Sequence, residues 1–284
     1  MGALDSLTTN SVIEAEVLKR FDELHTRGEL LWEPNEPIRI PQQPFDAYIR
    51  VSPALITKPY NPGDTSRKPA FTGDPPEYTL CEVGPAHKLI LNKYCWVRPQ
   101  LILHTLEYES QRDGLTLRDV DATWQVLEML GEGYMAIFNG GPEAGGSIAH
   151  KHVQIMPKPG WKMFPGKCLD QDAGMKSLGV VPFVHQFQVL FPESTSAAIF
   201  ASIKELSGSM SIPALYPAHN VVLTLSWLIV LPRRQAEVDG CAGGAQAMLG
   251  DIWTKTHDQV QQWRSLGPLS VLAQLGVTRP NDSI

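Results

Sequence analysis

Two histidines and a glutamine stand at alternate positions in the segment HKHVQ, residues 150–154, directly after a glycine-rich turn. On a strand, alternate side chains share one face, so His150, His152 and Gln154 are predicted to point the same way. An imidazole can attack phosphorus when its other nitrogen carries a proton fixed by a hydrogen bond, and the phosphoramidate that forms is reactive enough to be discharged again. The pattern therefore predicts that one of the two histidines carries a phosphate-linked group between two half-reactions.

The turn that precedes these residues holds four glycines within residues 139–146. A glycine backbone adopts positive φ and approaches a ligand without an intervening Cβ, and successive amide groups in such a turn form a concave anion site. Gly145 and Gly146 are expected to line this site, and Asn139 and Ser147 at its two ends can donate hydrogen bonds to phosphate or ribose. The turn is therefore predicted to bind the anionic part of a ligand.

Two other interpretations of the histidine pair stay open. His150 and His152 could be half-buried strand residues, the usual meaning of an isolated H-x-H pattern, or two ligands of a zinc ion. A zinc site needs a third and a fourth ligand, and no nearby cysteine or histidine spacing supplies them. The glycine turn, Ser147 and Gln154 favour phosphorus chemistry, so no metal held by the protein itself is expected.

The lysine of the motif and the histidines outside it are not expected to take part in the chemistry. Lys151 should point to the opposite face of the strand, where it is structural or solvent-facing. His87, His104 and His185 are expected to be packed or surface residues and not catalytic ones.

Apolar periodicity predicts the elements that position this segment. Helical spacing predicts helices over residues 11–27, 117–131 and 246–262 and from residue 269 onward, with Thr116 capping the second. Strands are predicted over residues 78–83, 88–97, 101–108, 134–138, near 150–156, 220–225 and 228–231, and residues 61–76 are predicted to be a loop. Antiparallel strands interrupted by a helix indicate an α+β fold. One compact unit over residues 1–284 is expected, built of two related halves, approximately 1–175 and 176–284, with the catalytic residues in the first.

Composition narrows the classes of function. The formal net charge is -6, so the surface as a whole offers no electrostatic footprint for nucleic acid, and an anionic ligand must be bound locally. No stretch reaches the roughly 18 apolar residues that a membrane helix needs. The four cysteines contain no C-x-x-C pair, which argues against a structural zinc site and against a secreted disulfide framework. A place in the cytoplasm, with or without the nucleus, is expected.

The string GGSIAHKHVQ resembles the histidine-triad superfamily in its transferase branch, where the pattern is H-x-H-x-Q. The longer string FNGGPEAGGSIAHKHVQIMP resembles the fungal diadenosine tetraphosphate phosphorylases, also called ATP adenylyltransferases. Similar strings at residues 51–59, 87–93, 220–233 and 266–277 extend the resemblance over nearly the whole chain. The resemblance implies a histidine-triad-like antiparallel sheet with flanking helices.

The same resemblance implies a mechanism in which His152 is the nucleophile. It would attack the α-phosphorus of diadenosine tetraphosphate (Ap4A), expel ATP and leave an adenylyl-histidine, from which phosphate then releases ADP. His150 would position His152 or contact the phosphates. The Gln154 amide cannot take up a proton near pH 7, so it is expected to hydrogen-bond a phosphate oxygen while the intermediate waits for phosphate.

The resemblance also implies a set of residues that bind the ligand. Lys58 and Lys93 are the expected cations, and Asn92 is an expected hydrogen-bond donor. Ile148 belongs to the same phosphate-binding turn, although the family commonly has a polar residue there. The segment DGCAGGAQAML, residues 239–249, loosely follows the family's small-residue run and places Met248 at the second nucleotide.

The expected partners are Ap4A, ATP, ADP and phosphate, with no nucleic acid and no membrane. No organic cofactor is expected, and magnesium is expected only as an ion bound to the nucleotide. Two alternatives remain at this point: an enzyme like the hexose-1-phosphate uridylyltransferases, which share H-x-H-x-Q, and a nucleotide-binding regulator without turnover. The zinc-ligand cysteines usual in the first are missing here, whereas the Ile148 departure motivates the second.

Overall fold

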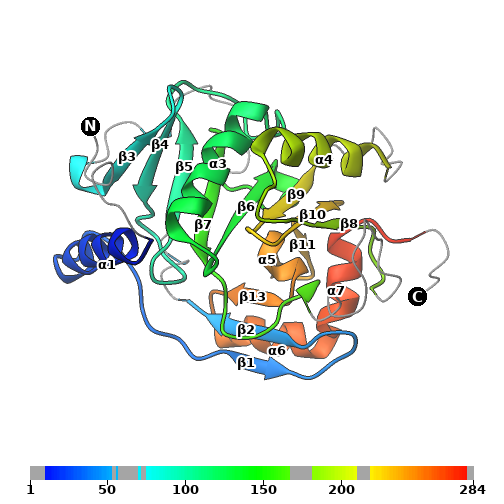
Figure 1. Cartoon of the computed structure of the whole chain (residues 1–284). Helices are drawn as coiled ribbons and strands as arrows, with labels where there is room; N and C mark the ends of the chain where they lie inside the picture. Colours follow the sequence, from blue (N-terminus) through cyan, green and yellow to red (C-terminus); the bar gives the residue numbers. More distant parts are fainter. Residues whose placement is uncertain are drawn as a thin grey trace.

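The computed structural model describes residues 10–52, 56, 70–71, 75–166, 181–209 and 218–279. Its central sheet contains β3 (Thr79–Val83), β4 (His87–Leu91), β5 (Leu101–Thr105), β6 (Tyr134–Gly140), β7 (His152–Pro157), β8 (Gln186–Val189), β9 (His219–Leu223) and β10 (Trp227–Pro232). These eight strands follow the order β3-β4-β5-β7-β6-β9-β10-β8, and every neighbouring pair is antiparallel (Figure 1). The predicted α+β class is confirmed, and strands from both predicted halves join one sheet.

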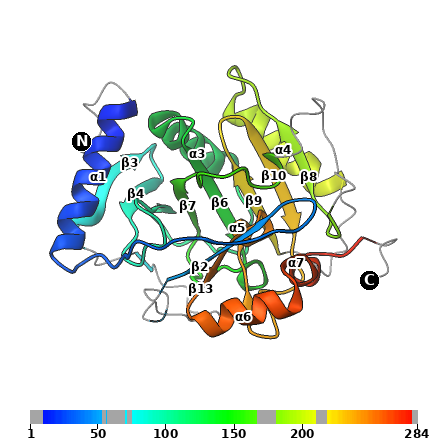
Figure 2. The ribbon, with the colours of Figure 1, turned by 90° about the horizontal axis from the view of Figure 1, so that it is seen from below.

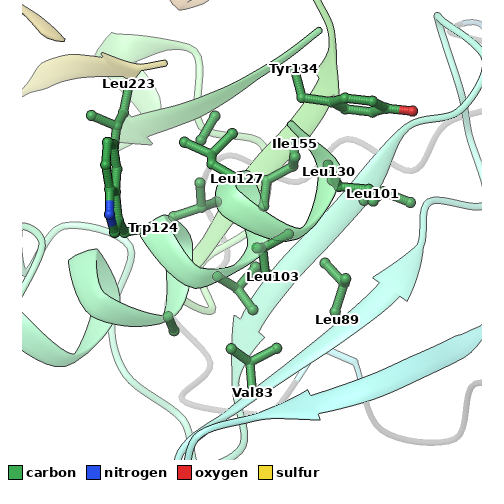
Figure 3. Close-up of a cluster of buried hydrophobic side chains, with 14 of the residues drawn as sticks. Val83, Leu89, Leu101, Leu103, Trp124, Leu127, Leu130, Tyr134, Ile155 and Leu223 are labelled. Carbon is green, nitrogen blue, oxygen red and sulfur yellow. The ribbon is translucent and has the colours of Figure 1, made fainter. Parts of the chain in front are cut away.

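Three long helices cover one face of the central sheet: α1 (Asn10–Thr26), α3 (Leu117–Leu130) and α4 (Ser196–Ser209). Figure 3 shows Leu127 and Leu130 of α3 near the strand residues Leu101, Leu103 and Ile155, while Trp124 lies toward Leu223. Each fully buried side chain of this size contributes roughly 1.5–3 kcal/mol to folding by leaving water. This face is therefore packed as a hydrophobic core.

A second layer covers the other face, toward the bottom of Figure 1 and nearest the viewer in Figure 2. It contains a small sheet of β1 (Ile38–Ile40), β2 (Ala47–Val51) and β13 (Asp251–Thr254), together with α5 (Ala245–Met248), α6 (His257–Leu266) and α7 (Pro268–Leu275). The strand pair β11 (Glu237–Val238) and β12 (Cys241–Ala242) and the short 3-10 helices η1 (Pro76–Tyr78) and η2 (Pro142–Ala144) complete the fold. β13 pairs in parallel with β2, so distant parts of the chain build this layer together.

Strand alternation decides which face carries the predicted site. Val153 and Ile155 of β7 lie in the core under α1 and α3. His152 and Gln154 alternate with them and so face the second layer. The histidine motif therefore lies on the face of the central sheet that the second layer covers.

Most elements of the first half were predicted correctly. The helix over 11–27 corresponds to α1, and the helix over 117–131 corresponds to α3. Thr116 caps α3 as expected, since its side chain accepts from the Asp119 amide while the Asp119 carboxylate accepts from the Thr116 amide. The strand predicted over 88–97 ends already at Leu91, because the chain turns where the Asn92 amide donates to the Gln100 carbonyl.

The helix predicted over residues 246–262 is wrong. The chain forms α5, then β13, then α6 in that interval. Gly250 has φ +93°, a left-handed conformation that ends α5, and Thr256 caps α6 by accepting from the Gln259 amide. The apolar spacing matched a helix by coincidence, whereas pairing with β2 makes residues 251–254 a strand.

Several expectations fall partly or wholly outside the described residues. They include most of the predicted loop over 61–76, Lys58 and Cys168. The other three cysteines are buried thiols. Among the described residues, no helix is both long and apolar enough to cross a membrane.

Candidate active site

His152 begins β7 and is buried, with 5% of its surface exposed. Its Nδ1 lies 2.9 Å from the carbonyl oxygen of His150. A carbonyl only accepts, so Nδ1 carries the proton and Nε2 carries the lone pair. This tautomer is the one that a nucleophilic imidazole requires.

His150 has the opposite tautomer. It lies just before β7, in a bridge to Ser110, and its Nδ1 accepts the Ala70 amide proton at 3.1 Å. Its Nε2 therefore carries the proton and donates toward the Glu107 carbonyl at 3.2 Å, with the Thr105 hydroxyl at 3.0 Å. Burial lowers the pKa of His150, so the ring is neutral near pH 7. With its lone pair engaged, His150 holds the site together and orients His152.

Gln154 belongs to a chain of side-chain and backbone hydrogen bonds. Its Oε1 accepts from Gln100 Nε2 at 2.9 Å, and Gln100 Oε1 in turn accepts from the Trp96 amide at 3.0 Å. Because its oxygen is engaged, Gln154 presents its NH2 group as the remaining donor. Gln100, which the sequence reading did not single out, therefore decides which end of the Gln154 amide faces a ligand.

Gln111 was also missed, and it separates the two strands that carry the site. The register of β6 and β7 ends at the pair Ile137 and Gln154. Beyond it, the Gln111 side chain accepts from the His152 amide at 2.7 Å and donates to the carbonyls of Asn139 and His152 at 2.9 and 3.1 Å. One side-chain amide thus replaces the next rung of the ladder and links the two strands beside His152.

The glycine turn follows β6 and includes η2. A Cβ on Gly145 would lie 2.8 Å from the Gly244 Cα, and one on Gly146 would lie 2.8 Å from the Gly141 oxygen. The Gly145 and Gly146 amides donate to Pro142 and Gly141 within the turn, both at 2.9 Å. The expectation that these two amides line an anion site stays a prediction, while the glycines permit close packing against residue 244.

Asn139 anchors the same turn to the second layer. Its Oδ1 accepts from Asn220 Nδ2 at 2.8 Å and from the Ala245 amide at 3.1 Å. The predicted donation from Asn139 to phosphate or ribose stays a prediction. The hydrogen bonds that it accepts show a structural role. It fixes the turn against the start of α5.

His104 lies opposite His152 in the β5–β7 register, so the two side chains share a face. Its Nδ1 donates to the Thr105 carbonyl at 2.9 Å, and no hydrogen-bond partner among the described residues reaches its Nε2. Burial lowers the pKa of His104 to about 4, which keeps the ring neutral. The Phe71 ring stacks on His104 at 4.6 Å, and its centre lies 5.3 and 5.7 Å from the rings of His150 and His152, so one phenyl ring contacts all three histidines.

Lys151 points to the opposite face of the strand, as predicted, but it is not solvent-facing. Only 2% of it is exposed, and Nζ lies 2.6 Å from Glu109 and 3.3 Å from Asp119. Asp119 also accepts from His87 at 2.8 Å. These charges and hydrogen bonds satisfy the buried ammonium and lock the motif onto the start of α3.

A cavity of about 210 Å³ adjoins the glycine turn. Gly145 and Ser147 line one side, and residues of the second layer, including Gln246, Asp251 and Lys255, line the other. The sequence reading did not single out these three, because it placed residues 246–262 on one helix. Lys255 brings a cation to the cavity beside the turn.

The other predicted ligand-binding residues have mixed positions. Asn92 is buried and its Oδ1 accepts from the Tyr94 amide at 3.1 Å, while Lys93 is exposed. Ile148 is half-buried just after the turn. Met248 packs in the core of the second layer and does not line the cavity, although its neighbours Gln246 and Ala247 do.

Comparisons with known proteins agree across both halves of the chain. Residues 58–166 match the family described as the Ap4A phosphorylase N-terminal domain, and residues 179–278 match the ATP adenylyltransferase C-terminal domain. In Saccharomyces cerevisiae, diadenosine 5',5'''-P1,P4-tetraphosphate phosphorylase 2 is 27% identical over 240 residues, which cover 72% of this chain and 73% of that protein. Protein APA1 of the same yeast is 28% identical over 253 residues, which cover 77% of this chain and 78% of that protein.

Solved structures show the same fold. The crystal structure of yeast Ap4A phosphorylase Apa2 in complex with Ap4A superposes with a TM-score of 0.79 at 22% identity, covering 96% of this chain and 99% of that chain. The complex of the same yeast protein with AMP gives a TM-score of 0.76 at 22% identity, covering 98% and 100%. The match extends over the central sheet and the second layer alike.

Proposed function

Because this chain belongs to the Ap4A phosphorylase (ATP adenylyltransferase) family, we propose that it converts Ap4A and phosphate to ATP and ADP through an adenylyl group held on His152. The observation that carries the covalent step is the 2.9 Å hydrogen bond from His152 Nδ1 to the His150 carbonyl. It directs the lone pair to Nε2 and leaves a proton on the far side of the ring to spread the positive charge that forms on adenylylation.

The two half-reactions balance without a change of oxidation state. In the first, a bond forms between His152 Nε2 and the α-phosphorus while the bond from that phosphorus to the bridging oxygen breaks, and ATP leaves. In the second, an oxygen of inorganic phosphate attacks the same phosphorus, the nitrogen–phosphorus bond breaks and ADP leaves. His152 returns to its starting tautomer, since Nδ1 keeps its proton throughout.

Gln154 favours transfer over hydrolysis in this scheme. Its oxygen is engaged by Gln100, so its NH2 group is the end that donates to a phosphate oxygen. An amide neither gives up nor takes up a proton near pH 7, so it supplies no base to activate water. The adenylyl group is then discharged by phosphate, an anion that needs no such base.

The polyphosphate requires cations, and charge neutralisation is a large part of catalysis in phosphoryl transfer. Lys255 is placed for this role because it lines the cavity with Gly145 and Ser147. Lys58 and Lys93 remain proposed contributors, and magnesium is proposed to accompany the nucleotide. Substituting each of the three lysines singly measures its contribution to the rate.

The deciding experiment combines product analysis with mass spectrometry. The protein incubated with Ap4A and phosphate should yield ATP and ADP in equal amounts. His152→Ala should lower this rate by at least a factor of about 10³, as expected for removal of a covalent nucleophile, whereas His257→Ala on the exposed start of α6 should leave it unchanged.

Protein incubated with Ap4A alone should carry one adenylate on the peptide that contains His152, and added phosphate should discharge it as ADP. Turnover that continues without this adduct, or that survives in His152→Ala, would contradict the covalent mechanism. Absence of ATP and ADP with the wild-type chain would contradict the activity itself.

A further inference from the structure

Gln100 and Gln154 form a pair of side-chain amides on the face of the central sheet that carries the histidines. Gln154 lies opposite Ile102 in the register of β5 and β7, and Gln100 is two residues before Ile102, so it continues the same face. Such diagonal neighbours on adjacent strands are about 7–8 Å apart, within the reach of long side chains. Gln100 Nε2 donates to Gln154 Oε1 at 2.9 Å, and the contact is buried. The orientation of one amide therefore depends on that of the other.

A backbone amide fixes the direction of this pair. Gln100 Oε1 accepts from the Trp96 amide at 3.0 Å, and a backbone N–H can only donate. If Gln100 were turned round, its NH2 group would face the Trp96 N–H and its oxygen would face the oxygen of Gln154. If Gln154 alone were turned round, two NH2 groups would face each other. Only the observed arrangement satisfies all three groups, and it directs the Gln154 NH2 group away from Gln100.

The turn between β4 and β5, residues 92–100, holds the Trp96 amide in place. The Asn92 amide donates to the Gln100 carbonyl at 2.9 Å and closes the turn at its base. Leu31, from the segment after α1, makes two further backbone hydrogen bonds to the turn, at 2.8 and 2.9 Å. The turn therefore presents a fixed donor to the Gln100 side chain.

Gln100 is fully buried, at 0% exposed, whereas Gln154 keeps 7% of its surface exposed, so Gln100 can act on a ligand only through Gln154. We propose that Gln100 is a positioning residue for the reaction, which turns Gln154 so that its NH2 group donates to the phosphate of the adenylyl group. The proposal rests on the function proposed above. A reversed Gln154 would face the phosphate with its own oxygen, and two acceptors have no proton to share.

The test measures the affinity for AMP relative to that for adenosine, which lacks the phosphate. Gln100→Glu keeps the shape and the acceptor for Trp96, but at pH 8.5 a carboxylate cannot donate, so Gln154 should turn its NH2 group toward it. The Gln154 oxygen then faces the phosphate. Calorimetry should show that AMP binds at least tenfold more weakly than to the wild type, while the affinity for adenosine changes by less than about twofold.

A Gln154→Met background separates this effect from the negative charge that Gln100→Glu adds. The amide is absent there, so Gln100→Glu should weaken AMP binding at least fivefold less than it does in the wild type. An equal or larger loss in the Gln154→Met background, or no loss in the wild type, would overturn the proposal. Gln261→Glu makes the same chemical change on the exposed face of α6 and should leave the affinity ratio unchanged.

If Gln100→Glu does not fold, Gln100→Met takes its place, because it removes the donor without adding a charge. It should lower the ratio of AMP affinity to adenosine affinity at least threefold when Gln154 is present, and leave it unchanged in the Gln154→Met background. A ratio that does not respond to Gln100→Met, or that responds equally in both backgrounds, would overturn the proposal.

Equilibrium binding also separates this proposal from the proposed function, since it needs no turnover. A wild type that forms no ATP and ADP contradicts the proposed function, and the AMP and adenosine affinities then still decide the role of Gln100. An active wild type whose Gln100→Glu variant keeps the same kcat/KM for Ap4A contradicts the positioning role and leaves the activity standing.

Discussion

In a histidine, the hydrogen-bond partner of one ring nitrogen decides whether the other nitrogen carries a proton or a lone pair. The His150 carbonyl fixes the proton of His152 on Nδ1, while the Ala70 amide fixes the proton of His150 on Nε2. His104 shares the tautomer of His152, but it is neutral, buried and covered by Phe71. Three histidines on one face therefore have three different environments, and only the one at position 152 combines a suitable tautomer with the glycine turn.

The Gln154 amide gives the sharpest prediction at this scale. Gln154→His replaces a group that cannot ionise by one that can act as a base near pH 7, so water should compete with phosphate for the adenylyl group. The ratio of AMP to ADP released from Ap4A should rise at least tenfold, measured by ion-exchange chromatography at fixed phosphate. An unchanged ratio would remove this account of Gln154, and Gln125→His on the exposed side of α3 serves as the control.

Among the elements, the segment between β5 and α3 supports the site most directly. It supplies the Glu107 carbonyl to His150, the Glu109 carboxylate to Lys151 and the Gln111 amide to the end of β6 and the start of β7. Asp119, in the first turn of α3, accepts from the Thr116 amide at the N-terminus of that helix and from Lys151 Nζ. A short connection thus positions a strand that lies 40 residues later in the chain.

Asp119 should make stability depend on pH. Burial alone would raise the pKa of Asp119, but its hydrogen bonds to His87 and Thr116 and the charge of Lys151 lower it to about 2. Because the folded-state pKa is below the unfolded value, the contribution is fully present above about pH 4 and is lost as the pH falls toward 2; its size is about 2 kcal/mol.

Asp119→Asn should therefore lower the free energy of unfolding by at least about 2 kcal/mol at pH 7, and the difference from wild type should shrink below pH 4. Urea unfolding across this pH range measures it. Asp121→Asn, which is exposed on the same helix, should change stability by less than about 0.5 kcal/mol. A difference that stays constant down to pH 2 would contradict the linkage.

In the whole molecule, Arg233 joins the two layers. This buried guanidinium donates to the carbonyls of Ala144 in the glycine turn, Leu275 at the end of α7 and Gly243 before α5, at 3.3, 3.1 and 2.7 Å. It also donates to Asn220 Oδ1 at 2.7 Å, and Asn220 itself donates to Asn139. One side chain therefore contacts the central sheet, the turn and the second layer.

Arg233→Lys keeps the charge but loses the planar fork of donors, so several buried carbonyls lose their partner. The free energy of unfolding should fall by roughly 3 kcal/mol or more. The KM for Ap4A should rise, because the residues that line the cavity beside the glycine turn are no longer held in place. Urea unfolding and steady-state kinetics measure the two effects. Arg234→Lys, exposed at the next position, should change neither; a stable Arg233→Lys protein with an unaltered KM would contradict this role.

Local patterns determined the chemistry of the motif and the elements of the first half. Alternation placed His152 and Gln154 on one face, and the capping box and apolar spacing predicted α3, because these features depend on residues within a few positions of one another. The same local logic failed over residues 246–262, where pairing with β2, about 200 residues away, makes a strand of a segment that has helical spacing.

Only the tertiary structure decided how the site is completed. Contacts between segments far apart in the chain fix the tautomer of His150, the orientation of Gln154 by Gln100 and the position of Gln111 between β6 and β7. No periodicity encodes such contacts, because they depend on which strands become neighbours and on which side chains are then enclosed. The sequence by itself therefore determined which side chain is the candidate nucleophile, and the packing of the two layers decided what surrounds that side chain.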